Sequence, residues 1–88
     1  MKRALQMTIQ LELNFFPSYA CDAVDSLYVF SLACSVVPHN SRYINRYKAL
    51  QRQAIDLKNY AFLHGYIDSD TYAYLANSIH ESADLFWS

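Results

Sequence analysis

The order of apolar and polar residues divides the chain into four segments. The first, residues 7–16, reads MTIQLELNFF and alternates strictly between apolar and polar residues as far as Phe15. Such alternation is typical of a β-strand with one buried face, so the pattern predicts a strand here. The alternative is a helix, because some apolar residues also recur at helical spacing. These residues are Leu5, Ile9, Leu13 and Phe16.

Pro17 and Ser18 predict the end of the strand and the start of a helix. Proline cannot donate to a strand ladder, and serine is a favourable N-cap residue. The helix is expected over residues 19–37, and its first half is amphipathic, with Asp22 and Asp25 on the polar side. Its second half is apolar on every side, which is typical of a helix that is buried all round. The rest of so short a chain can hardly surround it, so we expect another molecule to cover it.

Two further amphipathic helices are expected, over residues 42–63 and 70–87. Asn40 or Ser41 is expected to cap the first of them. Gly65, the only glycine in the chain, follows that helix at a position where a helix end favours positive φ. The residues expected to face the core are Tyr43, Tyr47, Leu50, Ala54, Leu57 and Ala61 in the first helix, and Tyr72, Leu75, Ile79, Ala83 and Phe86 in the second.

These elements predict a single mainly α domain of residues 1–88, with three helices and one short N-terminal β-strand. An all-α four-helix bundle is the alternative if the N-terminal segment is helical. Hydrophobic residues make up 53% of the chain and charged residues only 17%, whereas soluble domains contain about 25% charged residues. The surface is therefore expected to be unusually apolar, or partly covered by a partner. A lone strand also needs another strand beside it, so a homodimer is expected.

The charges are distributed unevenly along the chain. Residues 39–61 contain five bases and one acid, whereas residues 62–88 contain four acids and no base. This pattern predicts two helices whose solvated faces attract each other. The net charge of −1 gives no general attraction to nucleic acid or to an anionic membrane.

Residues that could form a catalytic or metal site are not grouped in the sequence. Cys21, Cys34 and the three histidines contain no pair at the close spacing of zinc ligands. One glycine is too few for a glycine-rich phosphate loop. The chain is therefore expected to be no enzyme and to need no cofactor. Two cysteines far apart on one helix are expected to be free thiols, which indicates the cytoplasm, or the host cytoplasm if a phage encodes the chain.

The segments MTIQLELNFFPS and NSRYINRYKAL resemble the ribbon-helix-helix family of repressors. In that family two chains pair their N-terminal strands, and the outward residues of this ribbon read the major groove of DNA. The resemblance covers residues 7–55 and implies a dimeric, DNA-binding transcriptional regulator. By this resemblance the residues that would contact nucleic acid are Thr8, Gln10 and Asn14.

The segment IDSDTYAYLANSIHESADLF resembles one helix of another small regulator. This is the second helix of the plasmid-encoded, RNA-binding helical hairpin that controls copy number. The shared residues are Asp68, Asp70, Ala73, Ser78, His80, Ala83 and Asp84. Because these residue types occur on many capped amphipathic helices, the resemblance assigns no RNA-contacting residue to this chain.

The unpaired strand, the apolar helix and the low charge together predict a non-enzymatic protein-binding module. Its expected action is that of a small regulator or inhibitor that occludes a partner protein, of the kind that phages and mobile elements encode. The residues expected to contact the partner are Tyr74, Leu85 and Trp87. Those expected to mediate self-association are Ile9, Leu11, Leu13, Val29, Leu32 and Val36. The DNA-binding regulator is the alternative function.

Overall fold

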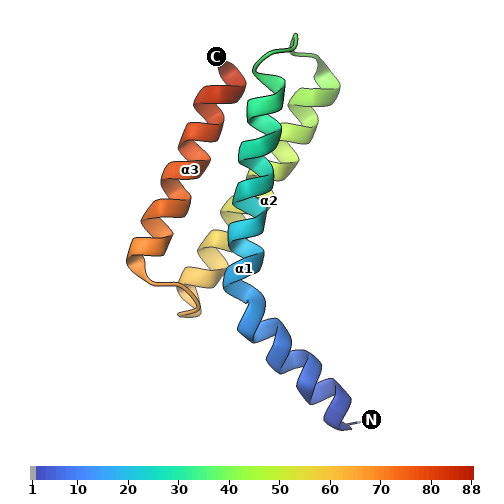
Figure 1. Cartoon of the computed structure of the whole chain (residues 1–88), viewed down its shortest axis with the longest axis vertical. Coiled ribbons are helices and arrows are strands. Elements are labelled where there is room, and N and C mark those ends of the chain that lie inside the picture. The colour runs from blue at the N-terminus through green and yellow to red at the C-terminus, as the bar shows by residue number, and fades with distance from the viewer. Residues whose placement is uncertain (1) are drawn as a thin grey trace.

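Over residues 2–88, the computed structural model has three α-helices and no strand (Figure 1). The helices are α1 (Lys2–Cys34), α2 (Ser41–Leu63) and α3 (Ser69–Trp87). The structure describes the backbone of residues 2–88 and the side chains of residues 18–88. α2 runs antiparallel to α1 and α3, and each helix contacts the other two. The described chain is therefore a three-helix bundle, which confirms the mainly α prediction.

The strand predicted over residues 7–16 is not supported, because α1 runs through these residues. A helix pairs its own N–H and C=O groups, whereas a lone strand leaves the groups along both edges unpaired. The predicted helix start at Ser18 is also wrong, because α1 begins at Lys2 and contains Pro17. α1 bends along its length (Figure 1), and proline commonly causes such bends because it removes one helical hydrogen bond. α1 also ends at Cys34, earlier than predicted.

The limits of α2 and α3 are set by three local signals, of which the sequence had indicated the Asn40 cap and Gly65. The Asn40 side chain accepts a hydrogen bond from the backbone N–H of Tyr43 at 3.0 Å and caps α2. Gly65 follows α2 with a φ of 72°, in the region that disfavours side chains. The Asp68 side chain accepts a hydrogen bond from the N–H of Thr71 at 2.8 Å and caps α3. The predicted ends of both helices are therefore confirmed to within a residue.

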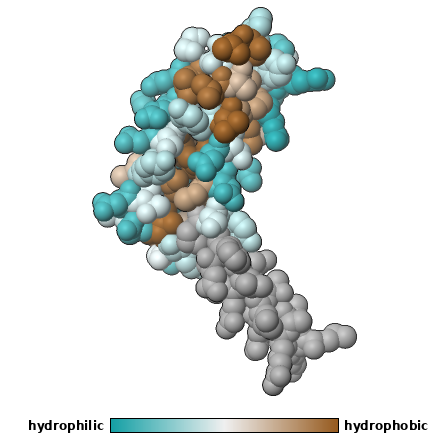
Figure 2. All heavy atoms as spheres, viewed as in Figure 1, coloured by the Kyte–Doolittle hydropathy of each residue, from teal (hydrophilic) through white to brown (hydrophobic). Residues whose placement is uncertain are grey.

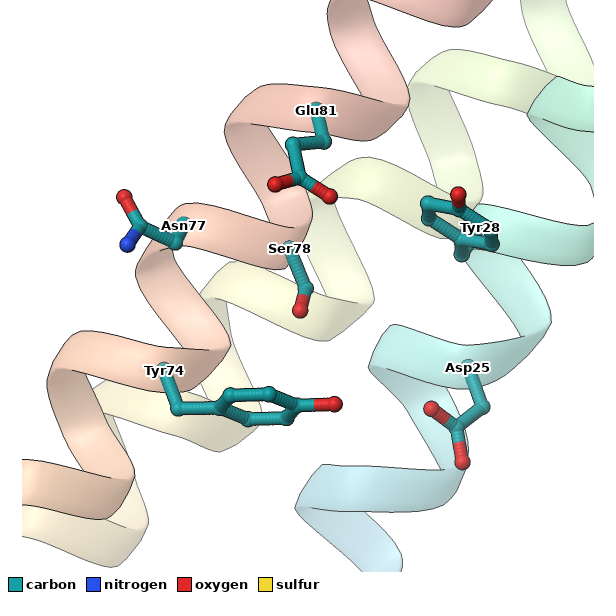
Figure 3. A pocket seen from close by; sticks show the side chains of 6 residues that line it. All are labelled: Asp25, Tyr28, Tyr74, Asn77, Ser78 and Glu81. Atoms are coloured by element: carbon teal, nitrogen blue, oxygen red, sulfur yellow. The ribbon is translucent and has the colours of Figure 1, made fainter.

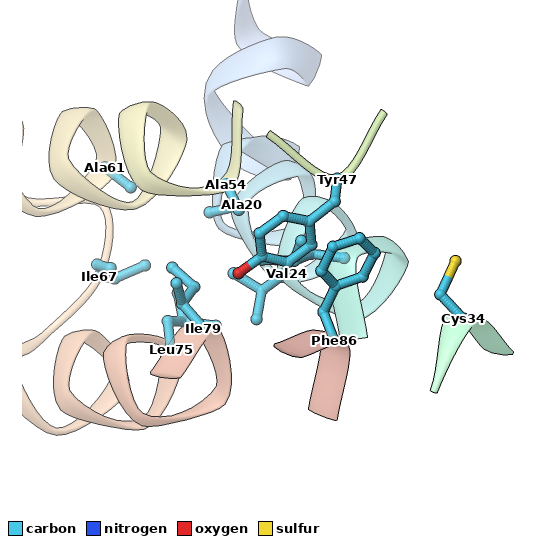
Figure 4. Packing of buried hydrophobic residues seen from close by; sticks show 11 residues of the cluster. Ala20, Val24, Cys34, Tyr47, Ala54, Ala61, Ile67, Leu75, Ile79 and Phe86 are labelled. Carbon is cyan, nitrogen blue, oxygen red and sulfur yellow. The ribbon is translucent and has the colours of Figure 1, made fainter. Parts of the chain in front are cut away.

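The apolar stripes of the three helices meet in one core (Figure 4). Its buried residues are Ala20, Val24, Leu27 and Cys34 of α1, Tyr47, Ala54 and Ala61 of α2, Ile67 of the second loop, and Leu75, Ile79 and Phe86 of α3. The core stripes predicted for α2 and α3 are confirmed, since their members are buried or half-buried. The rings of Tyr47 and Phe86 lie face to face in this core, with centroids 4.1 Å apart.

Candidate functional site

Apolar side chains point into solvent along the second half of α1 and just beyond its end. The exposed fractions are 64% for Val29, 50% for Leu32 and 83% for Val36. Figure 2 shows hydrophobic residues gathered over the upper part of α1, with hydrophilic residues on either side. On the opposite side of the same helix, Val24 and Leu27 are buried in the core. The second half of α1 is thus apolar on both sides, and no described residue covers the outer one.

A groove lies between α1 and α3 (Figure 3). It forms a hollow of about 320 Å³. Figure 3 shows the ring of Tyr74 reaching from α3 toward Asp25 on α1. The carboxylate of Glu81 and the ring of Tyr28 face the space between the two helices. The full lining is Asp25 and Tyr28 from α1 with Tyr74, Asn77, Ser78 and Glu81 from α3.

The groove and the apolar side of α1 are continuous. Asp25 lines the groove and, together with Val29, a shallow hollow beside it. Helical spacing places Leu32 one turn after Tyr28 on α1, and Leu85, which is half-buried, one turn after Glu81 on α3. We call this surface the α1–α3 face. It consists of Asp25, Tyr28, Val29, Leu32, Tyr74 and Glu81, and Val36 and Leu85 extend it toward the C-terminal ends of the two helices.

The charges on and around the α1–α3 face have one sign. Asp25 and Glu81 are both exposed, and there is no lysine or arginine in residues 18–40 or 59–88. Among the described side chains, every lysine and arginine therefore belongs to α2. Most of them are exposed, as the sequence predicted, whereas Lys58 is buried with its ammonium 4.2 Å from the centre of the Tyr72 ring. Over residues 18–88, α1 and α3 thus present exposed acids and no lysine or arginine, whereas α2 presents most of its bases to solvent.

Trp87 lies in an aromatic cluster at the C-terminal end of α3, apart from the residues that line the groove. Its ring stacks on that of His39 at 5.8 Å and meets the rings of Tyr47 and Phe86 edge-on. A ring nitrogen of His39 also forms a hydrogen bond with the backbone carbonyl of Phe86. Trp87 remains 53% exposed, so one side of its ring packs on the bundle while the rest meets solvent. Its role in partner binding stays a prediction.

The structure brings together residues that the sequence analysis assigned to two separate roles. Tyr74 and Leu85, predicted to bind a partner, share the α1–α3 face with Val29 and Leu32, predicted for self-association. Val36, also predicted for self-association, extends this face, whereas the side chains of the remaining residues named for self-association or nucleic-acid contact lie outside the described residues. They are Ile9, Leu11, Leu13, Thr8, Gln10 and Asn14.

Two residues of the α1–α3 face were not singled out by the sequence analysis. Tyr28 and Glu81 both line the groove. For Glu81 a signal was available, because it lies seven residues after Tyr74 and four before Leu85, and therefore on the same side of α3. No comparable signal identifies Tyr28, because its place at the groove depends on how α1 packs against α3.

The remaining features of the described residues indicate no second candidate site. Cys21 and Cys34 are free thiols. Within the described residues, no three histidine, cysteine or acidic side chains are grouped as metal ligands, and no helix has the length and hydropathy of a membrane span. Comparisons with known protein families, with characterised proteins and with solved structures found no match. The α1–α3 face is therefore the feature from which a function can be argued.

Proposed function

We propose that the chain is a non-enzymatic protein-binding module that acts through its α1–α3 face. In this proposal it is a small regulator or inhibitor that occludes a surface of another protein. The observation that carries the proposal is the exposure of Val29, Leu32 and Val36 along and just beyond one helix. Burial of apolar surface contributes about 25 cal/mol per Å². Covering this part of α1 therefore supplies a driving force for association.

The composition of the rest of the face supports the same function. Tyr28 and Tyr74 lie beside the apolar side chains, and tyrosine is enriched in protein interfaces. Exposed Asp25 and Glu81 form an edge that stays hydrated in the unbound protein. An apolar centre with a polar margin is the usual arrangement of an interface between proteins.

The DNA-binding alternative depended on an N-terminal strand, which the structure does not support. The ribbon-helix-helix resemblance requires paired N-terminal strands, and α1 runs through residues 7–16 instead. Four exposed bases remain on α2, but the face with apolar residues is acidic and would repel phosphates. We therefore propose protein binding alone.

A photo-crosslinking experiment in cells tests the proposal. A photoreactive phenylalanine analogue placed at Leu32 samples the α1–α3 face, and the same residue at Arg52 samples the exposed side of α2. We expect a light-dependent adduct of one defined mass from position 32 and none from position 52. An adduct with twice the mass of the chain would identify a second copy as the partner.

A substitution on the same face provides the second half of the test. Leu85→Asp should abolish the adduct from position 32 while leaving the far-ultraviolet circular dichroism spectrum unchanged. A matched Ala49→Asp change on the exposed side of α2 should leave the adduct intact. Equal adducts from positions 32 and 52, or none from position 32, would contradict the proposed function.

A further inference from the structure

We propose that the α1–α3 face binds a basic amphipathic helix of the partner, and that a lysine or arginine of this helix enters the groove between Asp25 and Glu81. The inference rests on the proposed function and adds the chemistry of the partner. It is carried by three properties of the face: its shape, its charge and the aromatic rings in its groove.

The shape of the face suits a helix. α1 and α3 lie side by side and run in the same direction, with residues of both lining the groove (Figures 1 and 3). A helix laid along this groove would pack on both and complete a four-helix arrangement. Amphipathic helices bind such grooves through apolar residues at helical spacing. Val29, Leu32 and Leu85 are placed to receive them.

The charge of the face favours a cationic partner. Asp25 and Glu81 are exposed on facing sides of the groove, and neither forms an ion pair with a described lysine or arginine. α1 from residue 18 onward and the whole of α3 contain neither of these bases. An incoming base is therefore the group that would compensate the two carboxylates. Opposite charges across an interface also speed association and select among partners.

The groove can also hold the base through its aromatic residues. The rings of Tyr28 and Tyr74 lie on opposite sides of the hollow, and aromatic faces attract ammonium and guanidinium groups. The same chemistry occurs within this chain, where the ammonium of Lys58 lies over the Tyr72 ring. A hollow of about 320 Å³ is large enough for one such side chain.

A second copy of this chain fits the face less well. The bases whose side chains the structure describes lie on α2, and between residues 41 and 56 the exposed residues of α2 are charged or polar apart from Ala49. That surface could compensate the charge of Asp25 and Glu81 but would leave Val29 and Leu32 facing polar groups. The helix that satisfies both parts of the face carries an apolar stripe flanked by lysine or arginine.

Two designed helical peptides test the inference with the full-length chain. They share one leucine stripe, and their remaining positions are mainly lysine in one and mainly glutamate in the other. Fluorescence anisotropy measures affinity, and amide chemical shifts of the labelled protein locate binding. We expect the lysine peptide to bind at least about tenfold more tightly, with the largest shifts at Asp25, Val29, Tyr74 and Glu81.

Matched charge variants separate the groove from general electrostatics. The double variant Asp25→Asn, Glu81→Gln should weaken binding of the lysine peptide by about tenfold or more. The control Asp56→Asn, Asp84→Asn removes the same charge from residues that do not line the groove, and should weaken binding by less than about threefold. Equal losses in the two variants would overturn the inference.

Three other results of these experiments would contradict the proposed basic helix. Equal affinity for both peptides, shifts confined to α2, or a stable dimer that buries the α1–α3 face would each overturn the basic-helix inference. If the crosslinks from position 32 persist in these cases, the proposed function stands and only the chemistry of its partner is wrong. If the lysine peptide binds as expected but cells give no adduct from position 32, the proposed function fails.

Discussion

Replacing Phe86 with leucine tests whether the aromatic cluster at the end of α3 stabilises the bundle. The Phe86 ring is fully buried. It lies parallel to the Tyr47 ring, with an angle of 5° and centroids 4.1 Å apart, and it meets the His39 ring edge-on at 4.6 Å. Leucine keeps the apolar character of the site and part of its volume but removes these two ring contacts, together with those to Phe30 and Trp87.

The size of the effect follows from these contacts. An aromatic pair contributes about 0.5–1.5 kcal/mol beyond its buried area. A smaller side chain in a packed site costs about a further 1 kcal/mol, because the surroundings close the gap only in part. We therefore expect Phe86→Leu to lower the free energy of unfolding by about 2 kcal/mol. This is a substantial fraction of the roughly 5–15 kcal/mol that stabilises a typical domain.

Urea unfolding followed by circular dichroism measures this loss. With a slope of about 1.3 kcal/mol per molar urea, typical of a small protein, the midpoint should fall by about 1.5 M. The matched control is Phe62→Leu, because Phe62 is 41% exposed and its ring contacts that of Tyr72 at 4.6 Å. This change should cost less than about 1 kcal/mol. Equal losses in the two variants would refute the assignment of stability to the Phe86 cluster.

Three further predictions concern single residues. The buried Ser31 hydroxyl has no hydrogen-bond partner among the described residues, so Ser31→Ala should raise the free energy of unfolding in urea by about 1 kcal/mol; a loss would show that the hydroxyl is satisfied. Hydrogen bonds from the Thr71 side chain and N–H lower the pKa of the Asp68 carboxyl below its ordinary 3.8. Its contribution to stability is therefore complete above the ordinary pKa and is lost as the pH falls through the lower folded value. Asp68→Asn should flatten this decline in thermal melts across an acid pH series, and an unchanged decline would contradict it. Burial, followed by the charge of Asp25, raises the pKa of the Cys21 thiol; Asp25→Asn should accelerate its alkylation, measured by peptide mass spectrometry, and an unchanged rate would exclude the electrostatic cause.

The limits of α2 and α3 could be predicted because the signals that set them are local. Asn40 and Asp68 each cap a helix through the backbone N–H three residues later, and Gly65 needs only its own backbone freedom. None of these signals depends on what the rest of the chain does. The core stripes of the two helices were predictable for a similar reason, because helical periodicity alone decides which residues share a side.

The N-terminal segment could not be assigned in the same way. Residues 7–16 satisfy the alternation of a strand, and a subset of their apolar residues also satisfies the spacing of a helix. The choice between the two depends on where the backbone hydrogen bonds are made. A strand needs a neighbour elsewhere in the chain or in another molecule, whereas a helix supplies its own pairs. The sequence offered no second strand, and this absence outweighs the alternation.

The α1–α3 face could be predicted in part. Exposure of Tyr74 follows from the helical pattern, since Tyr74 lies away from the core stripe predicted for its helix. Val29 and Leu32 were expected to face another molecule, because the second half of their helix is apolar on every side. That these residues belong to one surface depends on the packing of α1 against α3, which no pattern within a single helix specifies. The groove between Asp25 and Glu81 is a product of this packing and was not predictable from either helix alone.

One side of α1 packs in the core and the other is exposed, and this separation makes the proposed binding surface testable. Val24 and Leu27 hold α1 on the bundle, whereas Leu32 is half-exposed and Val36 almost wholly so. A charge introduced at Leu32 meets water in the unbound protein, so it costs little stability, but in a bound complex it would be buried against the apolar stripe of the partner. Leu32→Asp should therefore abolish binding without unfolding the chain. The exposed apolar side chains of this face do not stabilise the isolated bundle. This is the physical reason to propose that the face binds another molecule.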